Sequence, residues 1–529
     1  MYESASTQRA EKNPGDWQIS TATRCLSATR SDLASRQTAR PYRRTVTDRR
    51  SASTIPAVSG PTVLIMAAGQ GTRMRSAIPK VLHPICGRAL VSWPIIAARE
   101  AGAGRIAVIT SPERDIAGAL PEEVETVHQP EADGTGGAIR AALPVIEGSE
   151  AVIVLSGDVP LVSAELISEI AATHEREGAA ATVVSAILED PGSYGRVVRS
   201  ADGADVDRIV EAKAEGDATS EELAINEINA GIYVFDGARL AAVLPNLSND
   251  NAQGEYYLPD VLPLLRDAGG RIVAHVSTDP NVILGVNSRA DLALVEAEAR
   301  RQILHRHMLA GVTLVDPGAT WIEADVAIAE DVRIEPGVSL IGACEVGTGS
   351  VVGPHTTLID SRIGADVTVP HSYLVECDVA DRCSVGPFAY LRPKARLEEG
   401  AKAGTFVEIK NSRIGAGSKV PHLSYIGDAD VGDGANLGAT TITANYDGFT
   451  KSRTKIGHGA RTGVDTTLVA PVEIGDSAYT GAGSVISDDV SPGALALTRP
   501  EQVEIEGYAE RKARGNRADE ASSMKEEGK

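Results

Sequence analysis

The chain has 529 residues, 43% of them hydrophobic and 23% charged, which predicts a globular protein of two or three domains. Its formal net charge of −21 argues against nucleic acid or anionic lipid as partners, so any phosphate ligand must be held by a local site. No apolar run has the length of a membrane span or of a secretory signal, and the five irregularly spaced cysteines indicate reduced thiols in a cytoplasmic protein.

Residues 1–58 are rich in Ser, Thr, Ala and Arg and show little apolar periodicity, which predicts a disordered extension. An organelle transit peptide is the alternative, but the stretch contains acids such as Glu3 and Asp16, which transit peptides avoid. A disordered extension, or a start codon assigned too far upstream, explains the segment better.

Residues 59–287 alternate short apolar runs with helical stretches. The runs at 62–68, 105–110 and 151–158 are continuous rather than alternating, as in strands buried on both faces. This pattern predicts a Rossmann-like α/β domain with a parallel sheet covered by helices. Ligands of such domains bind outside the carboxyl ends of the strands.

A glycine loop follows the first of these strands, in the stretch VLIMAAGQGTRMRSAIPKVLH. Gly69 and Gly71 fit neither the dinucleotide fingerprint nor a Walker loop, so the spacing predicts another kind of anion-binding loop. Arg73 and Lys80 are placed to give two positive charges to a polyphosphate. Either cation could instead lie on a helix surface. The functional interpretation is favoured for Arg73 because it directly follows Gly-Thr, and for Lys80 because the VLH after it indicates a packed setting.

A second apolar strand ends in Asp158, within LSGDVPL. A carboxylate at a strand end faces the same edge as the glycine loop, where a magnesium ligand would lie. The alternative is a turn aspartate that caps the next helix. The strand-end position and the preceding glycine favour metal binding.

Residues 288–310 predict a linker helix, because apolar residues recur at three and four positions without an intervening Gly or Pro. From 311 to 505 an aliphatic residue followed by glycine recurs at spacings near five or six, for example at 341–342, 346–347 and 352–353. A six-residue unit is the signature of a parallel β-helix, whereas a β-sandwich needs spacings of eight to twelve. The charged residues 506–529 predict a disordered tail.

The β-helix contains Lys410, His422 and Tyr425 on successive coils, followed by the polar loop LGATTITANYDGFTKSRTKIG. Binding sites of solenoids gather at such loops. A histidine that titrates near neutral pH suits a general base, although a lone histidine is more often a surface or turn residue. The neighbouring NLGATT and NYDG motifs favour a catalytic role for His422.

Several motifs carry a resemblance: LIMAAGQGTRMRSAIPKVLHPICGR, EADGTGGA, SGDVPL, YGRV, INEINAGIY, NDNAQGEYYLPD and GVNSR. The first is similar to the signature of sugar-phosphate nucleotidyltransferases. Together, in this order, they resemble the family of bifunctional N-acetylglucosamine-1-phosphate uridylyltransferase/glucosamine-1-phosphate N-acetyltransferase enzymes, from about Pro61 to Arg499. The resemblance implies UTP, acetyl-CoA and glucosamine-1-phosphate as substrates, Mg²⁺ as cofactor and a left-handed β-helix that forms homotrimers with active sites between subunits.

For the first domain, the resemblance implies three groups of site residues. Those that would bind the nucleotide are Ala67, Ala68, Gly69, Gly71, Arg73, Lys80, Gln129, Gly134 and Thr135. Those that would bind the sugar are Gly195, Glu211, Asn229 and Thr135, and the metal ligands would be Asp158 and Asn287. Arg73 and Lys80 would be catalytic through charge neutralisation.

For the second domain, the resemblance implies His422 as the general base. The residues that would bind the acetyltransferase substrate are Arg392, Lys410, Tyr425, Asn436, Asn445 and Tyr446. Those that would contact substrate or acetyl-CoA are Ala439, Lys451, Val464, Ala482 and Arg499.

Three positions depart from the family pattern. Gly137 stands where histidine is common, and we expect little consequence because backbone contacts dominate there. Val464 stands where serine is usual, and Thr440 where glycine is common, so acetyl transfer would be slower or rely on backbone donors. These two favour the alternative of a single-activity sugar-phosphate nucleotidyltransferase with a β-helix used only for trimerisation; His422, Asn445 and Lys451 argue against it.

Overall fold

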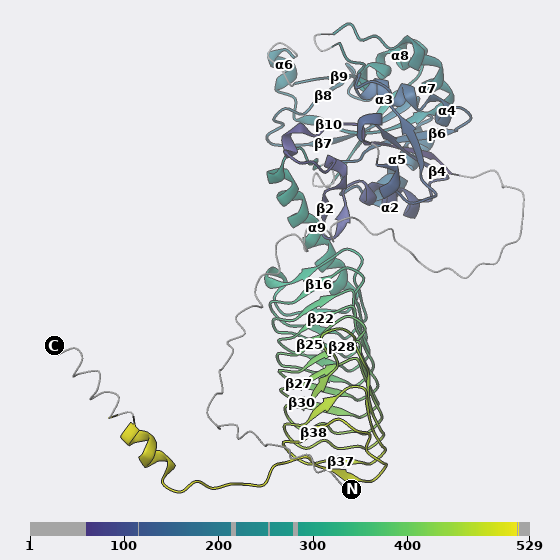
Figure 1. Ribbon diagram of the computed structural model, residues 1–529. Coiled ribbons are helices and arrows are strands. Elements are labelled where there is room, and N and C mark those ends of the chain that lie inside the picture. The colour runs from purple at the N-terminus through teal and green to yellow at the C-terminus, as the bar shows by residue number, and fades with distance from the viewer. Residues whose placement is uncertain are drawn as a thin grey trace, which may run out of the picture.

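The computed structural model describes residues 60–114, 116–212, 218–251, 254–278, 284–515 and 517. The extension expected over residues 1–58 lies outside the described residues. An α/β domain and a long prism of short strands are joined by one helix (Figure 1).

A seven-strand path forms the sheet of the first domain. Its order is β11 (Ile272–Val276), β7 (Ala181–Ile187), β10 (Glu227–Asp236), β6 (Ala151–Ser156), β1 (Thr62–Met66), β4 (Arg105–Thr110) and β5 (Glu125–His128). A further pair, β8 (Arg196–Arg199) and β9 (Val206–Val210), extends from β10. The expectation of a wholly parallel sheet is wrong at β10, which runs antiparallel to β6 and β7. A strand buried on both faces has the same apolar pattern in either direction, so the sequence does not encode this reversal.

Helices cover both faces of this sheet, as expected. On one face lie α2 (Ser92–Glu100) and α5 (Ala164–Glu177). On the other lie α3 (Thr135–Ala141), α4 (Leu143–Ile146), α7 (Gly237–Val243) and α8 (Val261–Asp267). The short α6 (Ser220–Leu223) precedes β10. The sheet is therefore buried except at its strand ends, where the glycine loop lies.

Helix α9 (Arg289–Leu309) matches the predicted linker. Ser288 and Asp291 begin it with a capping box, in which each side chain accepts a backbone hydrogen bond from the other end of the first turn. The small hairpin of β2 (Pro84–Ile85) and β3 (Arg88–Ala89) packs beside it, and the Ala324 N–H donates to the Cys86 carbonyl at 3.0 Å. The hairpin, the helix and the first coil thus form one junction between the two domains.

Three parallel sheets form the prism, which is a left-handed β-helix (Figure 1). The first face contains β12 (Thr313–Leu314), β15 (Arg333–Ile334), β18 (Val351–Val352), β21 (Thr368–Val369), β24 (Ser384–Val385), β27 (Lys402–Thr405) and β30 (Lys419–His422). The second face contains β13 (Trp321–Ile322), β16 (Ser339–Ile341), β19 (Thr357–Ile359), β22 (Tyr373–Val375), β25 (Tyr390–Leu391), β28 (Glu408–Lys410), β31 (Tyr425–Gly427), β33 (Ile442–Ala444), β35 (Thr467–Val469) and β38 (Val485–Ile486). The third face contains β14 (Ala327–Ile328), β17 (Glu345–Val346), β20 (Arg362–Ile363), β23 (Asp378–Val379), β26 (Arg396–Leu397), β29 (Arg413–Ile414), β32 (Ala429–Val431), β34 (Thr454–Ile456) and β36 (Val472–Ile474). The final strands β37 (Tyr479–Thr480) and β39 (Leu495–Ala496) pair with each other.

The aliphatic-glycine pairs have a direct physical cause in this prism. The aliphatic member, such as Val431 or Ile456, is buried in the core. The following glycine lies against the backbone of the next coil: a Cβ at Gly432 would be 2.6 Å from the His458 nitrogen. Coils can stack this closely only where that side chain is missing.

Two further observations complete the fold. Residues 508–515, within the stretch expected to be disordered, are helical and exposed, and residues 518–529 lie outside the described part of the chain. Among the residues that the structure describes, no helix is both long and apolar enough to cross a membrane.

Candidate functional site

The glycine loop leaves β1 at the carboxyl edge of the sheet. The Ala67 N–H donates to the Ile109 carbonyl at the end of β4, and the Gly157 N–H, just after β6, donates to the Met66 carbonyl of β1. The ends of β1, β4 and β6 therefore meet there. Gly71 has φ of +61°, and a Cβ on it would lie 2.6 Å from the Lys80 Cβ. Glycine is needed at this position both for the left-handed backbone and for the approach of Lys80.

Both predicted cations pair with the two predicted metal ligands. Arg73, in the short 3₁₀ helix Thr72–Met74, donates from Nη2 to Asn287 Oδ1 at 3.0 Å. Lys80, in the 3₁₀ helix Lys80–Leu82, forms an ion pair with Asp158, and both side chains are less than one-fifth exposed. The Val286 N–H donates to the Asp158 carbonyl at 2.9 Å, which holds Asn287 beside this pair. Four residues far apart in the sequence therefore form one cluster.

The donor atoms of this cluster fit a hard divalent cation. Asp158 supplies carboxylate oxygens, one of which accepts from Ser156 Oγ at 2.6 Å, and Asn287 supplies an amide oxygen. Mg²⁺ is commonly held by one or two carboxylates together with substrate phosphates and water. No cluster of three or more His, Cys, Asp or Glu side chains with the geometry for a metal occurs among the described residues.

Three of the expected nucleotide-binding residues, Gln129, Gly134 and Thr135, lie at the same sheet edge, where α3 begins. Gln129 directly follows β5, and its N–H donates to the Thr110 carbonyl at 2.8 Å. Thr135 Oγ1 accepts from the Leu258 N–H at 3.0 Å. Gly134 has φ of +101°, and a Cβ there would lie 2.5 Å from the Tyr256 carbonyl oxygen, so the loop before η6 (Leu258–Asp260) closes on the start of α3.

The expected sugar residues form a second group nearby in the sheet. The Asn229 N–H donates to the Gly195 carbonyl at 2.9 Å, and Asn229 Nδ2 donates to the Tyr233 hydroxyl at 2.7 Å. Glu211 follows the end of β9; burial raises the pKa of the Asp260 carboxyl, and the negative charge of Glu211 raises this pKa further. Burial also raises the pKa of Tyr233, the partner of Asn229, and the negative charge of Glu211 adds to this, so Gly195, Glu211 and Asn229 lie in one region.

His422 ends β30 at the corner between the first and second faces, which we call the first corner. Its carbonyl accepts from Ser424 Oγ at 2.7 Å, while the residue is exposed. Within the described part of the chain, the imidazole has no hydrogen-bond partner. The ring is thus free to meet a ligand or another subunit.

The expected acetyl-CoA residues follow His422 along the same corner. The Thr440 N–H donates to the His422 carbonyl at 3.3 Å. The Asp465 N–H donates to the Ala439 carbonyl, and the Gly483 N–H donates to the Val464 carbonyl. A Cβ on Gly463 would lie 2.5 Å from the Ala482 nitrogen, and one on Gly483 would lie 4.0 Å from the Arg499 Cδ. The residues thus stack coil on coil: Ala439, Val464, Ala482 and Arg499.

The two departures at this corner have different structural settings. Thr440 has φ of +57°, where a β-branched residue is strained, which gives a physical reason for glycine at this position. The Val464 side chain is half exposed and offers no polar atom.

A buried carboxylate, Asp428, organises the corner between the second and third faces, which we call the second corner. It accepts hydrogen bonds from Lys410 Nζ at 3.2 Å, from Asn411 Nδ2 and from Asn445 Nδ2. Burial alone would raise the pKa of Asp428, but these hydrogen bonds and the Lys410 charge hold it below the usual value. Lys410 and Asn445 are thereby fixed in place.

Sequence reasoning missed Asp428. The corners of the prism hold other aspartates with positive φ, such as Asp360 and Asp366, so residue type and spacing do not single it out. Only its burial and its three partners do.

The remaining substrate residues are spread over two faces. Arg392, after β25, donates from Nη1 to Glu408 at 2.8 Å, and Glu408 pairs in register with Tyr425 on the second face. Asn436 pairs with Lys419 on the first face instead. One chain therefore does not bring all of the expected residues together.

The polar loop after β33 forms a protruding turn. Tyr446 pairs with Lys451 in an antiparallel bridge, and its hydroxyl donates to the Gly448 carbonyl at 2.6 Å. Asp447 accepts from two backbone N–H groups, which lowers the pKa of its carboxyl to about 2. Phe449, at the tip, is 93% exposed.

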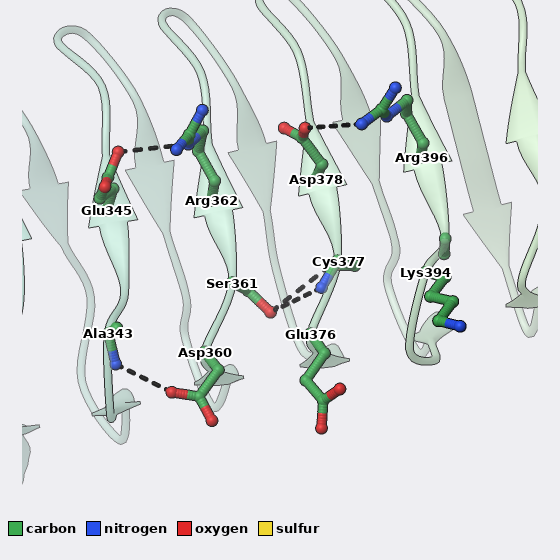
Figure 2. A pocket seen from close by; sticks show the side chains of 11 residues that line it. Ala343, Glu345, Asp360, Ser361, Arg362, Glu376, Cys377, Asp378, Lys394 and Arg396 are labelled. Carbon is green, nitrogen blue, oxygen red and sulfur yellow. Dashed lines mark hydrogen bonds and ion pairs between the residues drawn. The ribbon is translucent and has the colours of Figure 1, made fainter. Parts of the chain in front are cut away.

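A groove of about 470 Å³ lies on the third face, and the Ala395 N–H in its lining donates to the Arg392 carbonyl at 3.0 Å. Figure 2 shows two ion pairs along it, Glu345 with Arg362 at 3.2 Å and Asp378 with Arg396 at 3.8 Å, while Asp360 accepts from the Ala343 N–H. The lining holds four acidic and three basic side chains, so most of its charge is compensated, and none of the predicted site residues lines it. We therefore do not regard it as an active site.

Comparisons with known proteins agree with this two-site arrangement. The MobA-like NTP transferase domain family matches residues 63–221. The bifunctional protein GlmU of Streptomyces avermitilis is 46% identical over 477 residues, which cover 88% of this chain and 98% of that protein. The GlmU proteins of Kineococcus radiotolerans and Mycobacterium tuberculosis are 48% and 43% identical, over 89% and 88% of this chain and 96% and 95% of their own lengths.

Proposed function

This chain belongs to the family of bifunctional GlmU proteins, and from that premise we propose which residues carry each of its two reactions. The enzyme acetylates glucosamine-1-phosphate with acetyl-CoA, and then transfers UMP from UTP to N-acetylglucosamine-1-phosphate with release of pyrophosphate. The observation that carries this function is the high identity along both domains rather than along the first alone. A single-activity nucleotidyltransferase is not favoured.

In uridylyl transfer, a phosphate oxygen of the sugar attacks the α-phosphorus of UTP in line, and the bond to pyrophosphate breaks. Arg73 and Lys80 would leave their partners Asn287 and Asp158 and neutralise phosphate charge. The backbone N–H groups near Gly69 and Gly71 would hold the triphosphate, and Gly195, Glu211 and Asn229 the sugar. No covalent enzyme intermediate is needed.

A divalent metal serves the uridylyl reaction, and we assign Mg²⁺ to Asp158 and Asn287. The oxygen-only donor set supports this assignment. When bound, the ion would supply charge neutralisation at the phosphates.

In acetyl transfer, His422 would take a proton from the sugar ammonium as the amine attacks the thioester carbonyl. The amide bond forms as the bond to the CoA sulfur breaks. Lys410 and Arg392 would bind the sugar phosphate, with Tyr425, Asn436 and Asn445 at its hydroxyls and Tyr446 and Lys451 nearby. Ala439, Val464, Ala482 and Arg499 would line the acetyl-CoA path.

We assign a homotrimer, with acetyltransferase sites between subunits. An exposed ridge supports this assignment: along the first corner, ring centroids of Phe388 and Phe406 lie 5.3 Å apart, and both side chains are more than half exposed. The ridge leads to Leu423, beside His422, whereas Asp428 lies on the next corner, five residues or about 16 Å further along the chain. A second subunit packed on the ridge would complete the site.

A cytoplasmic location completes the proposal. The cysteines among the described residues are free and buried, as expected of a reducing compartment.

One assay tests the two activities together. The full chain is incubated with glucosamine-1-phosphate, acetyl-CoA, UTP and Mg²⁺, and the products are separated. UDP-N-acetylglucosamine is expected. If UDP-N-acetylglucosamine forms only when N-acetylglucosamine-1-phosphate is supplied, the protein has uridylyl transfer alone. No product from either sugar would contradict the proposal.

A further inference from the structure

A half-buried polar cluster at the start of α3 contains three residues that the assignments above do not use: Asp133, Arg140 and Tyr256. Asp133 lies at its centre: one carboxylate oxygen accepts from Gln129 Nε2 at 2.7 Å, and the other accepts from Arg140 Nη2 at 3.1 Å. The Tyr256 N–H donates to the Asp133 carbonyl at 2.7 Å. The Arg140 guanidinium lies 3.9 Å from the centre of the Tyr256 ring. Side chains from the loop and the helix thus converge on one carboxylate, and Tyr256 holds the Asp133 backbone and the Arg140 guanidinium in place.

This cluster determines which way the Gln129 amide points. Its NH₂ group donates both to Asp133 and to the Gly134 carbonyl, at 2.7 and 3.0 Å. A carboxylate and a carbonyl only accept hydrogen bonds, so the reversed amide would place its oxygen against two other oxygens. The orientation therefore follows from chemistry, and it leaves the Gln129 carbonyl oxygen as the polar atom available to a ligand.

Gly137 makes room for this carboxylate. A Cβ on Gly137 would lie 1.9 Å from Asp133 Oδ1 and 2.3 Å from Cγ. Gly137 lies inside α3 with ordinary helical backbone, so its missing side chain is not required by conformation. The earlier expectation that this departure has little consequence took no account of Asp133, which fills the space.

We propose that Asp133 is a positioning residue that presents only the carbonyl of Gln129 to the base, and so selects uracil over cytosine. Uracil carries an N–H donor at N3, which pairs with a carbonyl oxygen, whereas cytosine carries an acceptor there and would face it unpaired. A site built to bond a donor discriminates strongly against a partner that lacks it. The inference rests on the proposed use of UTP, and it takes Gln129, one of the expected nucleotide-binding residues, as the residue that contacts the base.

Two variants disturb the carboxylate in different ways. Asp133→Asn keeps the shape but adds a donor, which can turn the Gln129 amide; Gly137→Ala keeps Asp133 but pushes it aside. For each full-length variant, kcat/KM is measured with UTP and with CTP at saturating N-acetylglucosamine-1-phosphate and Mg²⁺, by pyrophosphate release. We expect the CTP-to-UTP ratio to rise about tenfold in both variants, the effect of one hydrogen bond.

Arg140→Met is the matched control, because it loosens the same cluster but leaves the Asp133 carboxylate against Gln129. Its CTP-to-UTP ratio should match that of the unchanged protein. Acetyl transfer by each sample verifies folding, since that site lies in the other domain. An unchanged ratio in both Asp133→Asn and Gly137→Ala, or an equal rise in Arg140→Met, would overturn the inference. Failure of the unchanged protein to use UTP would instead overturn the proposed function.

Discussion

The two ends of the molecule build their sites in opposite ways. In the first domain, one chain brings Arg73, Lys80, Asp158 and Asn287 into a single cluster, since neighbouring strands of an open sheet end at the same edge. In the β-helix, coils stack along an axis, so His422 and Asp428 lie on separate corners. The edge of an open sheet brings residues from several strands close together, whereas a β-helix places residues at separate corners along its axis. We therefore propose that the second site needs another surface to complete it, and the following experiments compare the two sites.

The largest effect is expected from Asp158→Ala. It removes the partner of Lys80 and the one carboxylate of the proposed metal site. Uridylyl transfer should fall by at least about 10³-fold, with acetyl transfer unchanged. Both activities are measured on the same sample.

Asp267→Ala is the matched control, since the Asp267 side chain is 73% exposed and lies away from the cluster. Both of its activities should be normal. Near-normal uridylyl transfer in Asp158→Ala would break the assignment of the first site.

The next largest effect is expected from His422→Ala. Without the general base, acetyl transfer should fall by about 10²–10³-fold, while uridylyl transfer from pre-acetylated sugar continues. His305→Ala, an exposed histidine on α9, should alter neither activity. Equal loss of both activities in His422→Ala would indicate misfolding, and would remove the evidence that the two sites are separate.

A smaller effect, about tenfold on acetyl transfer, is expected from Asp428→Asn. The amide cannot accept from Lys410, Asn411 and Asn445 together as the carboxylate does. The pKa of Asp428 is lower in the folded state than its unfolded value of about 3.9. The ionised carboxylate therefore stabilises the fold at neutral pH, and this stabilisation is lost as the pH falls below about 3.9. Denaturant titrations at pH 7 and pH 3 should therefore show a smaller acid-induced loss in Asp428→Asn, and unchanged acetyl transfer would contradict its positioning role.

The smallest effect concerns α9, which joins the two regions. His307 is buried, its Nε2 has no partner among the described residues, and burial followed by the Arg306 charge lowers its pKa to about 4. The folded state therefore holds His307 neutral, and stability falls as the pH drops from 6.5 toward 4, by about 2 kcal/mol at pH 5. Denaturant titrations at pH 8 and pH 5 should show this loss in the unchanged protein and less of it in His307→Leu. An equal loss in both would exclude His307 as its source.

Much of the fold was predictable because its signals are local. The glycines of the β-helix recur wherever one coil lies on the next, and the limits of α9 follow from apolar spacing and the Ser288 cap. The direction of β10 was not predictable, since a doubly buried strand has the same pattern either way. Asp428 and Asp133 were missed because each is one acid among many until its partners are known.

The sequence by itself determined the α/β and β-helix architecture and the family, and it predicts an anion loop with Arg73 and Lys80; all of these depend on residue type and spacing along the chain. Only the tertiary structure decided the partners: Arg73 with Asn287, Lys80 with Asp158, Asp428 with Lys410 and Asn445, and Asp133 in the space left by Gly137. The reason is physical. Sequence patterns report which side chains are buried and how often they recur, whereas an ion pair or a filled space depends on two residues that the chain brings together only after folding.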